Sequence, residues 1–185
     1  MRRIVLYSHD TLGLGHLRRN LLIAQQLASS PTPTAILLIT GASQASAFAL
    51  PPGVDCLSLP AVCKKDNGSY GSRRLGISTS ALIALRSKMI RAAIEEFNPD
   101  VLIVDKVPRG VLRELDPTLK CLRAGSHTRC VLGLRDVLDD PATVRTEWRE
   151  AENEEAIEGY YDAIWVYGDP NVYDVVDEYG FSDAI

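Results

Sequence analysis

Short apolar runs alternate with longer segments of mixed character along the chain. The runs occupy residues 3–8, 34–40, 54–60, 101–106, 129–136 and 163–169. Several of them are continuously apolar, which is typical of strands that are covered on both faces. We therefore predict six strands at these positions.

The segments between the runs predict helices at residues 16–29, 78–97, 109–119 and 142–160, with a short helix at 173–179. The second of these has one apolar face at helical spacing, which we expect to pack in the core. That face comprises Leu82, Leu85, Met89, Ala93 and Phe97. Pro99 ends the helix, because the residue before a proline avoids the helical region.

Alternating strands and helices predict an α/β fold, a doubly wound parallel sheet of Rossmann-like type with right-handed crossovers. The length of 185 residues suits one well-buried domain. Residues 180–185 stop where a further element is expected, so the pattern predicts a domain, 1–185, that is truncated at its C-terminal end. One long irregular stretch, residues 61–76, predicts a mobile loop that carries Tyr70 between basic pairs.

The net charge of −4 conceals an uneven distribution. Residues 1–135 contain 18 Lys and Arg against 9 Asp and Glu, whereas residues 136–185 contain 2 against 15. A basic region favours an anionic partner, such as a phosphate or an acidic membrane surface. The acidic segment is more simply interpreted as a solvated helix.

Several classes of protein are disfavoured by composition. No run approaches the roughly 20 apolar residues of a membrane-spanning helix, and no signal peptide is visible, so we expect a cytoplasmic location. The four cysteines are spaced too widely for a C-x-x-C motif. We expect reduced cysteines and no metal, cofactor or nucleic-acid partner.

The first strand leads directly into a glycine-containing turn and then a helix. The turn holds Asp10, Gly13 and Gly15, and His16 begins the helix. Ligands of open α/β sheets bind at the carboxyl ends of the strands, where exposed helix N–H groups favour negative charge. Glycines allow close approach of a ligand to the backbone. The position is therefore that of a binding site.

Two common nucleotide-binding motifs do not fit this turn. A dinucleotide fingerprint requires a third glycine, but Arg18 stands in its place. It also requires an acidic residue after the second strand, and residues 39–42 contain none. A P-loop requires Gly-Lys-Ser/Thr, which is absent as well.

A first strand that ends in a glycine turn, followed by Gly15 and His16 at the helix start, resembles the N-terminal half of GT-B-type glycosyltransferases. It is most similar to the branch of the peptidoglycan N-acetylglucosaminyltransferase and its predicted-glycosyltransferase relatives, whose loop reads Gly-Gly-Thr-Gly-Gly-His. Residues 10–16 read Asp-Thr-Leu-Gly-Leu-Gly-His, which keeps Gly-His and one earlier glycine but differs by two leucines and an aspartate. The similarity extends over nearly the full chain, although only this loop is a specific motif.

The resemblance implies an inverting transfer from a nucleotide-sugar donor to an acceptor hydroxyl, with this half of the enzyme holding the acceptor. His16 would then be the base that accepts the hydroxyl proton, since a histidine is partly neutral at cellular pH. The competing interpretation is that His16 binds donor phosphate or only packs. Asp10 would orient the imidazole or bind a sugar hydroxyl, or would merely cap the turn.

Further candidates lie at the ends of later strands. Asp105 is a second base candidate, and Lys106 and Arg109 are candidate phosphate contacts; the alternative is a local ion pair at a helix start. Arg135 follows the fifth strand, and Asp139 or Asp140 is expected to cap the next helix. The remaining candidate substrate-binding residues are Gly13, Gly15, Arg18 and Tyr70.

Two other functions remain open. One is a GT-B-fold nucleotide-sugar epimerase, and the other is a non-catalytic acceptor-binding subunit of a split transferase. In the transferase interpretation the donor is held mainly by a missing second domain, so this chain alone should show no turnover. The acceptor would carry a hydroxyl on a phosphorylated or lipid-linked molecule, with a peripheral membrane location as an option.

Overall fold

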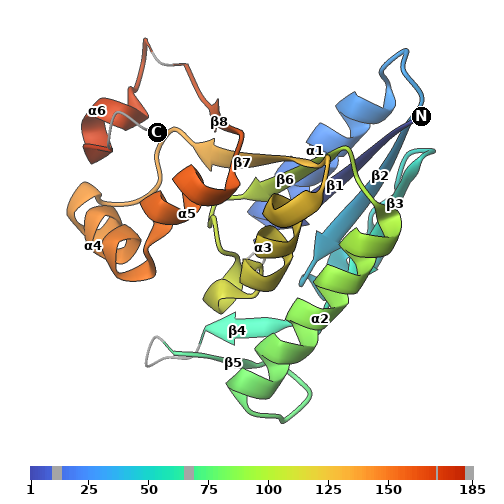
Figure 1. Cartoon of the computed structure of the whole chain (residues 1–185), viewed down its shortest axis with the longest axis horizontal. Helices are drawn as coiled ribbons and strands as arrows, with labels where there is room; N and C mark the ends of the chain where they lie inside the picture. Colours follow the sequence, from blue (N-terminus) through green and yellow to red (C-terminus); the bar gives the residue numbers. More distant parts are fainter. Residues whose placement is uncertain (10–13, 65–68, 170, 182–185) are drawn as a thin grey trace.

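The computed structural model describes residues 1–9, 14–64, 69–169 and 171–181, and its centre is a six-stranded sheet (Figure 1). All six strands are parallel and lie in the order β3-β2-β1-β6-β7-β8. The strands are β1 (Arg2–Ser8), β2 (Thr34–Thr40), β3 (Val54–Ser58), β6 (Val101–Asp105), β7 (Arg129–Arg135) and β8 (Ala163–Tyr167). The predicted strands and the Rossmann-like α/β class are confirmed, and the order is that of a doubly wound sheet.

Helices cover both faces of this sheet (Figure 1). They are α1 (Gly15–Ala28), α2 (Thr79–Phe97), α3 (Asp116–Gly125), α4 (Pro141–Ala151), α5 (Asn153–Tyr160) and α6 (Val175–Tyr179). Alternate residues of β1 point to opposite faces, as strand geometry requires. Ile4 and Leu6 pack in a cluster with α1, whereas Val5 and Tyr7 pack in a second cluster with the remaining helices.

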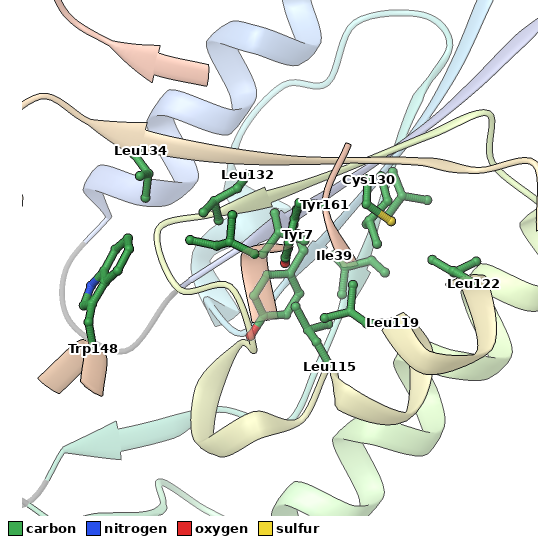
Figure 2. Close-up of a cluster of buried hydrophobic side chains, with 14 of the residues drawn as sticks. Tyr7, Ile39, Leu115, Leu119, Leu122, Cys130, Leu132, Leu134, Trp148 and Tyr161 are labelled. Atoms are coloured by element: carbon green, nitrogen blue, oxygen red, sulfur yellow. The ribbon is translucent and has the colours of Figure 1, made fainter. Parts of the chain in front are cut away.

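The second cluster is the larger one and contains several aromatic side chains. Figure 2 shows Tyr7 of β1 among Leu132 of β7 and Leu115 and Leu119 at α3. Trp148 of α4 lies at the edge of the same view, and its ring stacks on Phe181 with centroids 4.4 Å apart. The stacking fixes the end of the described chain against α4.

Helix α2 buries part of the face that the sequence predicts: Leu82 is buried, and Met89 and Phe97 pack against the core. Leu85 is 41% exposed, and the buried line is Leu82, Arg86, Ile90 and Ile94. An arginine therefore occupies a core position that the apolar pattern had assigned to its neighbours. The helix limits agree with prediction, since Ser78 caps the first turn by accepting a hydrogen bond from Ala81 N at 3.2 Å.

Three other predicted elements require correction. The stretch 61–76, expected to be a loop, contains an antiparallel pair, β4 (Val62–Lys64) and β5 (Tyr70–Ser72), packed on α2 through buried Val62 and Leu82. The helix expected at 109–119 is a short 3-10 turn, η2 (Val111–Arg113), followed by α3. The helix expected at 142–160 breaks into α4 and α5, because Glu152 adopts the left-handed conformation with φ of 53°.

A buried ion pair connects α2 to the segment that follows β6. The Arg86 guanidinium donates two hydrogen bonds of 2.6 Å to the Glu114 carboxylate, and the Tyr7 hydroxyl donates another of 2.6 Å to the same group. Arg86 also donates to the backbone carbonyl of Pro60 at 2.7 Å. Burial and the negative charge of Glu114 raise the pKa of Tyr7 well above its ordinary value, so the phenol stays protonated. One carboxylate thereby joins β1, α2 and two loops.

We expect Glu114→Ala to lower the free energy of unfolding by about 3–5 kcal/mol, because the Arg86 charge would be left buried without a partner. Chemical denaturation measures this loss. The exposed pair Arg91–Glu95 on α2 supplies a matched control, and Glu95→Ala should change stability far less. Combining Glu114→Leu with Arg86→Met should recover much of the loss, since both charges are then removed. Equal losses for Glu114→Ala and Glu95→Ala would contradict a role for the buried pair.

Candidate functional site

The carboxyl ends of β1, β6 and β7 bring residues far apart in sequence to one edge of the sheet. Tyr7 of β1 pairs with Val104 of β6, so Asp105 lies beside the point where β1 ends. Asp105 is itself in register with Gly133 of β7. Helix α1 begins at the same edge and carries His16 in its first turn. The site that topology predicted is thus assembled from elements far apart along the chain, as the His16–Asp105 separation of 89 residues shows.

His16 and Asp105 are in direct contact. The imidazole Nδ1 lies 2.6 Å from Asp105 Oδ2, and the two side chains are 17% and 2% exposed, respectively. Burial alone would raise the pKa of Asp105, but the hydrogen bond from His16 and the charges of His16 and Arg19 lower it below the usual range. Asp105 is therefore a buried carboxylate that stays ionised.

The ionised state of Asp105 determines which nitrogen of His16 can act as a base. A carboxylate only accepts hydrogen bonds, so His16 Nδ1 must carry the proton and donate it to Asp105. The lone pair of the neutral ring is then on Nε2. No hydrogen bond to Nε2 forms among the residues that the structure describes. This arrangement can remove a proton from a ligand hydroxyl.

Two residues that the sequence interpretation missed complete the surroundings of Asp105. Arg19 pairs with Asp105 Oδ1 through Nη2. Asn20 donates from Nδ2 to the His16 carbonyl at 2.9 Å and to Asp105 Oδ2 at 3.4 Å. Residues three and four positions after His16 share its helix face, and this spacing is the signal that could have identified them.

Tyr167 of β8 also contacts Arg19. Its guanidinium carbon lies 5.3 Å from the centroid of the Tyr167 ring, within the range of a cation–π contact. Burial first, and then the negative charge of Asp105, raise the pKa of Tyr167 above its ordinary value. Tyr167 is therefore a neutral phenol beside an arginine–carboxylate pair.

His9 lies directly against His16. Their rings are in edge contact, with centroids 5.8 Å apart, and His9 is only 6% exposed. Burial, with the charges of Lys106 and His16, lowers the pKa of His9 to about 3. The His9 ring is therefore neutral at cellular pH and does not compete with His16 for a proton.

The structure describes three of the remaining candidates, Gly15, Arg18 and Lys106. Asp10 and Gly13 lie outside the described residues. Gly15 is exposed at the first position of α1, and a Cβ added there would meet no heavy atom within 4 Å. Arg18 is exposed on α1. Lys106 is half-buried near His9 and has a positive φ of 68°.

Arg109, expected to hold a phosphate, has other partners. Its guanidinium pairs with Asp116 and lies 2.9 Å from Glu152 at the junction of α4 and α5. The hydrogen bonds to Asp116 and Glu152 raise the pKa of Arg109 beyond its ordinary value. This contact corresponds to the local ion pair that was the alternative interpretation of Arg109, and it ties α3 to the α4–α5 turn.

Arg135 and Tyr70 are also engaged elsewhere. Arg135 donates to the carbonyl of Leu138 at 3.0 Å and so closes the turn after β7. Tyr70 packs in the small cluster around Val62 and Leu82, and its carbonyl accepts from Thr79 at 3.0 Å. The structure therefore brings together His16 and Asp105, and gives Arg109, Arg135 and Tyr70 local structural contacts. Asp140 caps α4 as expected, accepting from Thr143 N at 3.0 Å.

Within the described ranges, no group of three or more His, Cys, Asp or Glu side chains has an arrangement that could hold a metal ion. Over the same part of the chain, helices that are both long and apolar enough to cross a membrane are not found.

Comparison with known proteins gives a fold relationship. No family model matches the chain, and no curated protein matches its sequence. Among solved structures, a protein from Listeria monocytogenes assigned as a UDP-N-acetylglucosamine 2-epimerase superposes with a TM-score of 0.55 at 8% identity. The match covers 96% of this chain and 41% of that protein, so the chain spans less than half of its neighbour's length. At this identity the likeness is one of fold alone: it agrees with a Rossmann-like α/β domain and does not identify an activity.

The buried neutral state of His9 predicts a pH-dependent stability. A histidine whose pKa falls from about 6.5 in the unfolded chain to about 3 in the folded one stabilises the fold fully above pH 6.5. That stabilisation is lost as the pH falls, by about 3 kcal/mol at pH 4. We expect His9→Gln, which cannot take up a proton, to show a correspondingly flatter decline in unfolding free energy between pH 6.5 and pH 4. A constant difference between the two proteins over this range would exclude a neutral buried His9.

Proposed function

We propose that this chain is the acceptor-binding half of a GT-B-type glycosyltransferase in which His16 is the general base. The observation that carries the proposal is the contact between His16 Nδ1 and the buried carboxylate of Asp105 at 2.6 Å. It leaves Nε2 as the basic atom at the carboxyl edge of a parallel sheet, where ligands of this fold bind. The GT-B-like fold of the structural neighbour supports the same superfamily.

In the proposed reaction the acceptor hydroxyl hydrogen-bonds to His16 Nε2. As the hydroxyl oxygen forms a bond to the anomeric carbon of the donor sugar, its proton passes to Nε2 and the bond to the nucleotide phosphate breaks. The nucleotide leaves with the electron pair of that bond, and inversion at the anomeric carbon results. Asp105 keeps its charge throughout and stabilises the imidazolium that forms, so it acts through His16 and not as a second base.

The rest of the substrate contacts are part of the same proposal. The nucleotide-sugar donor is held mainly by a second domain. Arg18, exposed early on α1, and Lys106, half-buried beside His9, are the basic residues best placed to contact a phosphate on the acceptor. Arg109 is not included, because its guanidinium is committed to Asp116 and Glu152.

A second candidate function is epimerisation of a nucleotide sugar, which the function assigned to the structural neighbour favours. In that reaction the base removes a proton from a sugar carbon, and a proton returns to the opposite face of the same carbon. His16 and Asp105 can supply the first step equally well. The two reactions differ in the substrate atom that loses its proton and in the need for a separate acceptor.

We expect His16→Ala to reduce turnover by roughly 10²–10⁴-fold in the protein that includes its donor-binding domain, because proton removal from the acceptor would be lost. Asp105→Asn should also reduce kcat, since an amide cannot stabilise the imidazolium. Initial rates with a nucleotide sugar and an acceptor measure both effects. Arg18→Ala, on the same helix turn, is the control and should change KM more than kcat. Turnover close to wild type in His16→Ala would refute the general-base assignment.

Solvent deuterium distinguishes the transferase from the epimerase. The protein is incubated with a nucleotide sugar in D₂O without any acceptor, and the sugar is followed by NMR. A transferase should leave the carbon-bound protons of the donor unchanged, because it exchanges only hydroxyl protons. Deuterium at a sugar carbon, together with a second epimer, would establish the alternative.

A further inference from the structure

One buried carboxylate is shared by two basic side chains in this site. Asp105 uses Oδ2 to accept from His16 and Oδ1 to accept from Arg19, and its side chain is 2% exposed. Arg19 Nη2 also lies 3.1 Å from His16 Nδ1. Arginine is charged at all relevant pH values, so its charge alone balances that of Asp105.

The position of Arg19 is fixed by a second layer of packing. The Tyr167 ring lies beneath the guanidinium, with a separation of 5.3 Å from its carbon to the ring centroid. The same ring lies directly over Gly133 of β7, where an added Cβ would come within 2.9 Å of two ring carbons and closer still to the hydroxyl. Gly133 therefore leaves the space that Tyr167 fills, and Tyr167 in turn supports Arg19.

The charged and titratable groups that face His16 come from α1, β6, β8 and the segments that follow β1 and β6. Asp105 of β6 is negative and Arg19 of α1 is positive, whereas His9 after β1 and Tyr167 of β8 are neutral. Lys106 adds a further positive charge on the side of His9. With neutral His16 the Asp105–Arg19 pair is balanced. A protonated His16 would add an uncompensated positive charge in a largely buried setting, which is unfavourable.

We propose that Arg19 is a positioning and charge-balancing residue that keeps His16 in its neutral form, with Tyr167 and Gly133 holding the guanidinium in place. The role in catalysis rests on the proposed function of His16 as a base, but the charge balance itself does not depend on turnover. Without Arg19, Asp105 would stabilise the imidazolium more strongly. A larger fraction of His16 would then carry a proton and be unable to accept another.

The test is NMR titration of the chain labelled with ¹⁵N-histidine, since there are only three histidines in the sequence. Long-range ¹H–¹⁵N spectra report the protonation and tautomer of each ring, and His16→Gln assigns the His16 signals. We expect Arg19→Met to increase the proton affinity of His16 about tenfold, because a like charge is removed and Asp105 is released. Asp105→Asn should change the proton affinity in the opposite direction.

Matched variants separate charge from packing. Arg18→Met removes the same charge from the neighbouring, exposed position and should leave the His16 titration unchanged. Arg19→Lys retains the charge and should restore most of the wild-type titration. Gly133→Ala should move Tyr167 and give a partial shift in the direction of Arg19→Met. This variant also keeps the proposal testable if Arg19→Met does not fold, which the signals of distant His127 would reveal.

Each outcome bears on a different claim. A His16 titration in Arg19→Met and Gly133→Ala identical to wild type would overturn the charge-balancing role, as would a lysine variant that behaves like the methionine variant. If these shifts occur but His16→Ala retains full turnover, the base assignment fails while the charge balance stands. In the active protein, Arg19→Met should move the acid limb of the rate profile to higher pH, and Arg19→Lys should move it back.

Discussion

The carboxylate of Glu114 is the constraint on which the carboxyl edge of the sheet depends. It is fully enclosed and accepts hydrogen bonds from Arg86 and Tyr7, so each partner would be a buried, unsatisfied group without it. Because Arg86 also bonds the carbonyl of Pro60, the loops after β3 and β6 are both tied to α2. Helix α2 in turn supports the β4–β5 hairpin. The path of the chain from β3 to α3 is thus tied to the pairing of the buried Glu114 carboxylate with Arg86.

Asp105 is a second buried carboxylate whose charge must be paired, but its pairing has a different consequence. It too is buried and ionised, and it too is paired with an arginine. The difference lies in the partner other than arginine. Tyr7 donates its hydroxyl, the only polar group of its side chain, to Glu114, whereas His16 uses one ring nitrogen for Asp105 and keeps another, on a side chain that is 17% exposed. The network around Glu114, in which the polar groups are paired with one another, contributes stability. The network around Asp105, which leaves a ring nitrogen accessible, can take part in a reaction. The surrounding packing decides which of the two a buried carboxylate becomes.

The sequence predicts most of the sheet and the heart of the site, for physical reasons that can be stated. Buried parallel strands are continuous apolar runs, and topology alone places His16 and Asp105 at the same edge. The core position of Arg86 could not be predicted, because its partner Glu114 is 28 residues away and only pairing makes burial of the charge tolerable. Arg19 was missed as well, although its position three residues after His16 on the same helix face could have indicated it. Glu152, where the predicted helix breaks, also has a partner far away in sequence, since its carboxylate lies 2.9 Å from Arg109.

The neighbours of His16 bear on the choice between the two proposed reactions. Transfer to a hydroxyl requires one base, because the proton leaves the oxygen as its bond to the sugar forms. Epimerisation requires a proton to be removed from one face of a carbon and returned to the other, and a two-base mechanism needs a second group that changes protonation state. Among the described residues that contact His16, His9 stays neutral and Asp105 stays ionised at cellular pH. Among the described residues of the site, His16 is then the side chain proposed to exchange a proton, which agrees with the proposed transferase; the epimerase would need a second such group from another part of the protein.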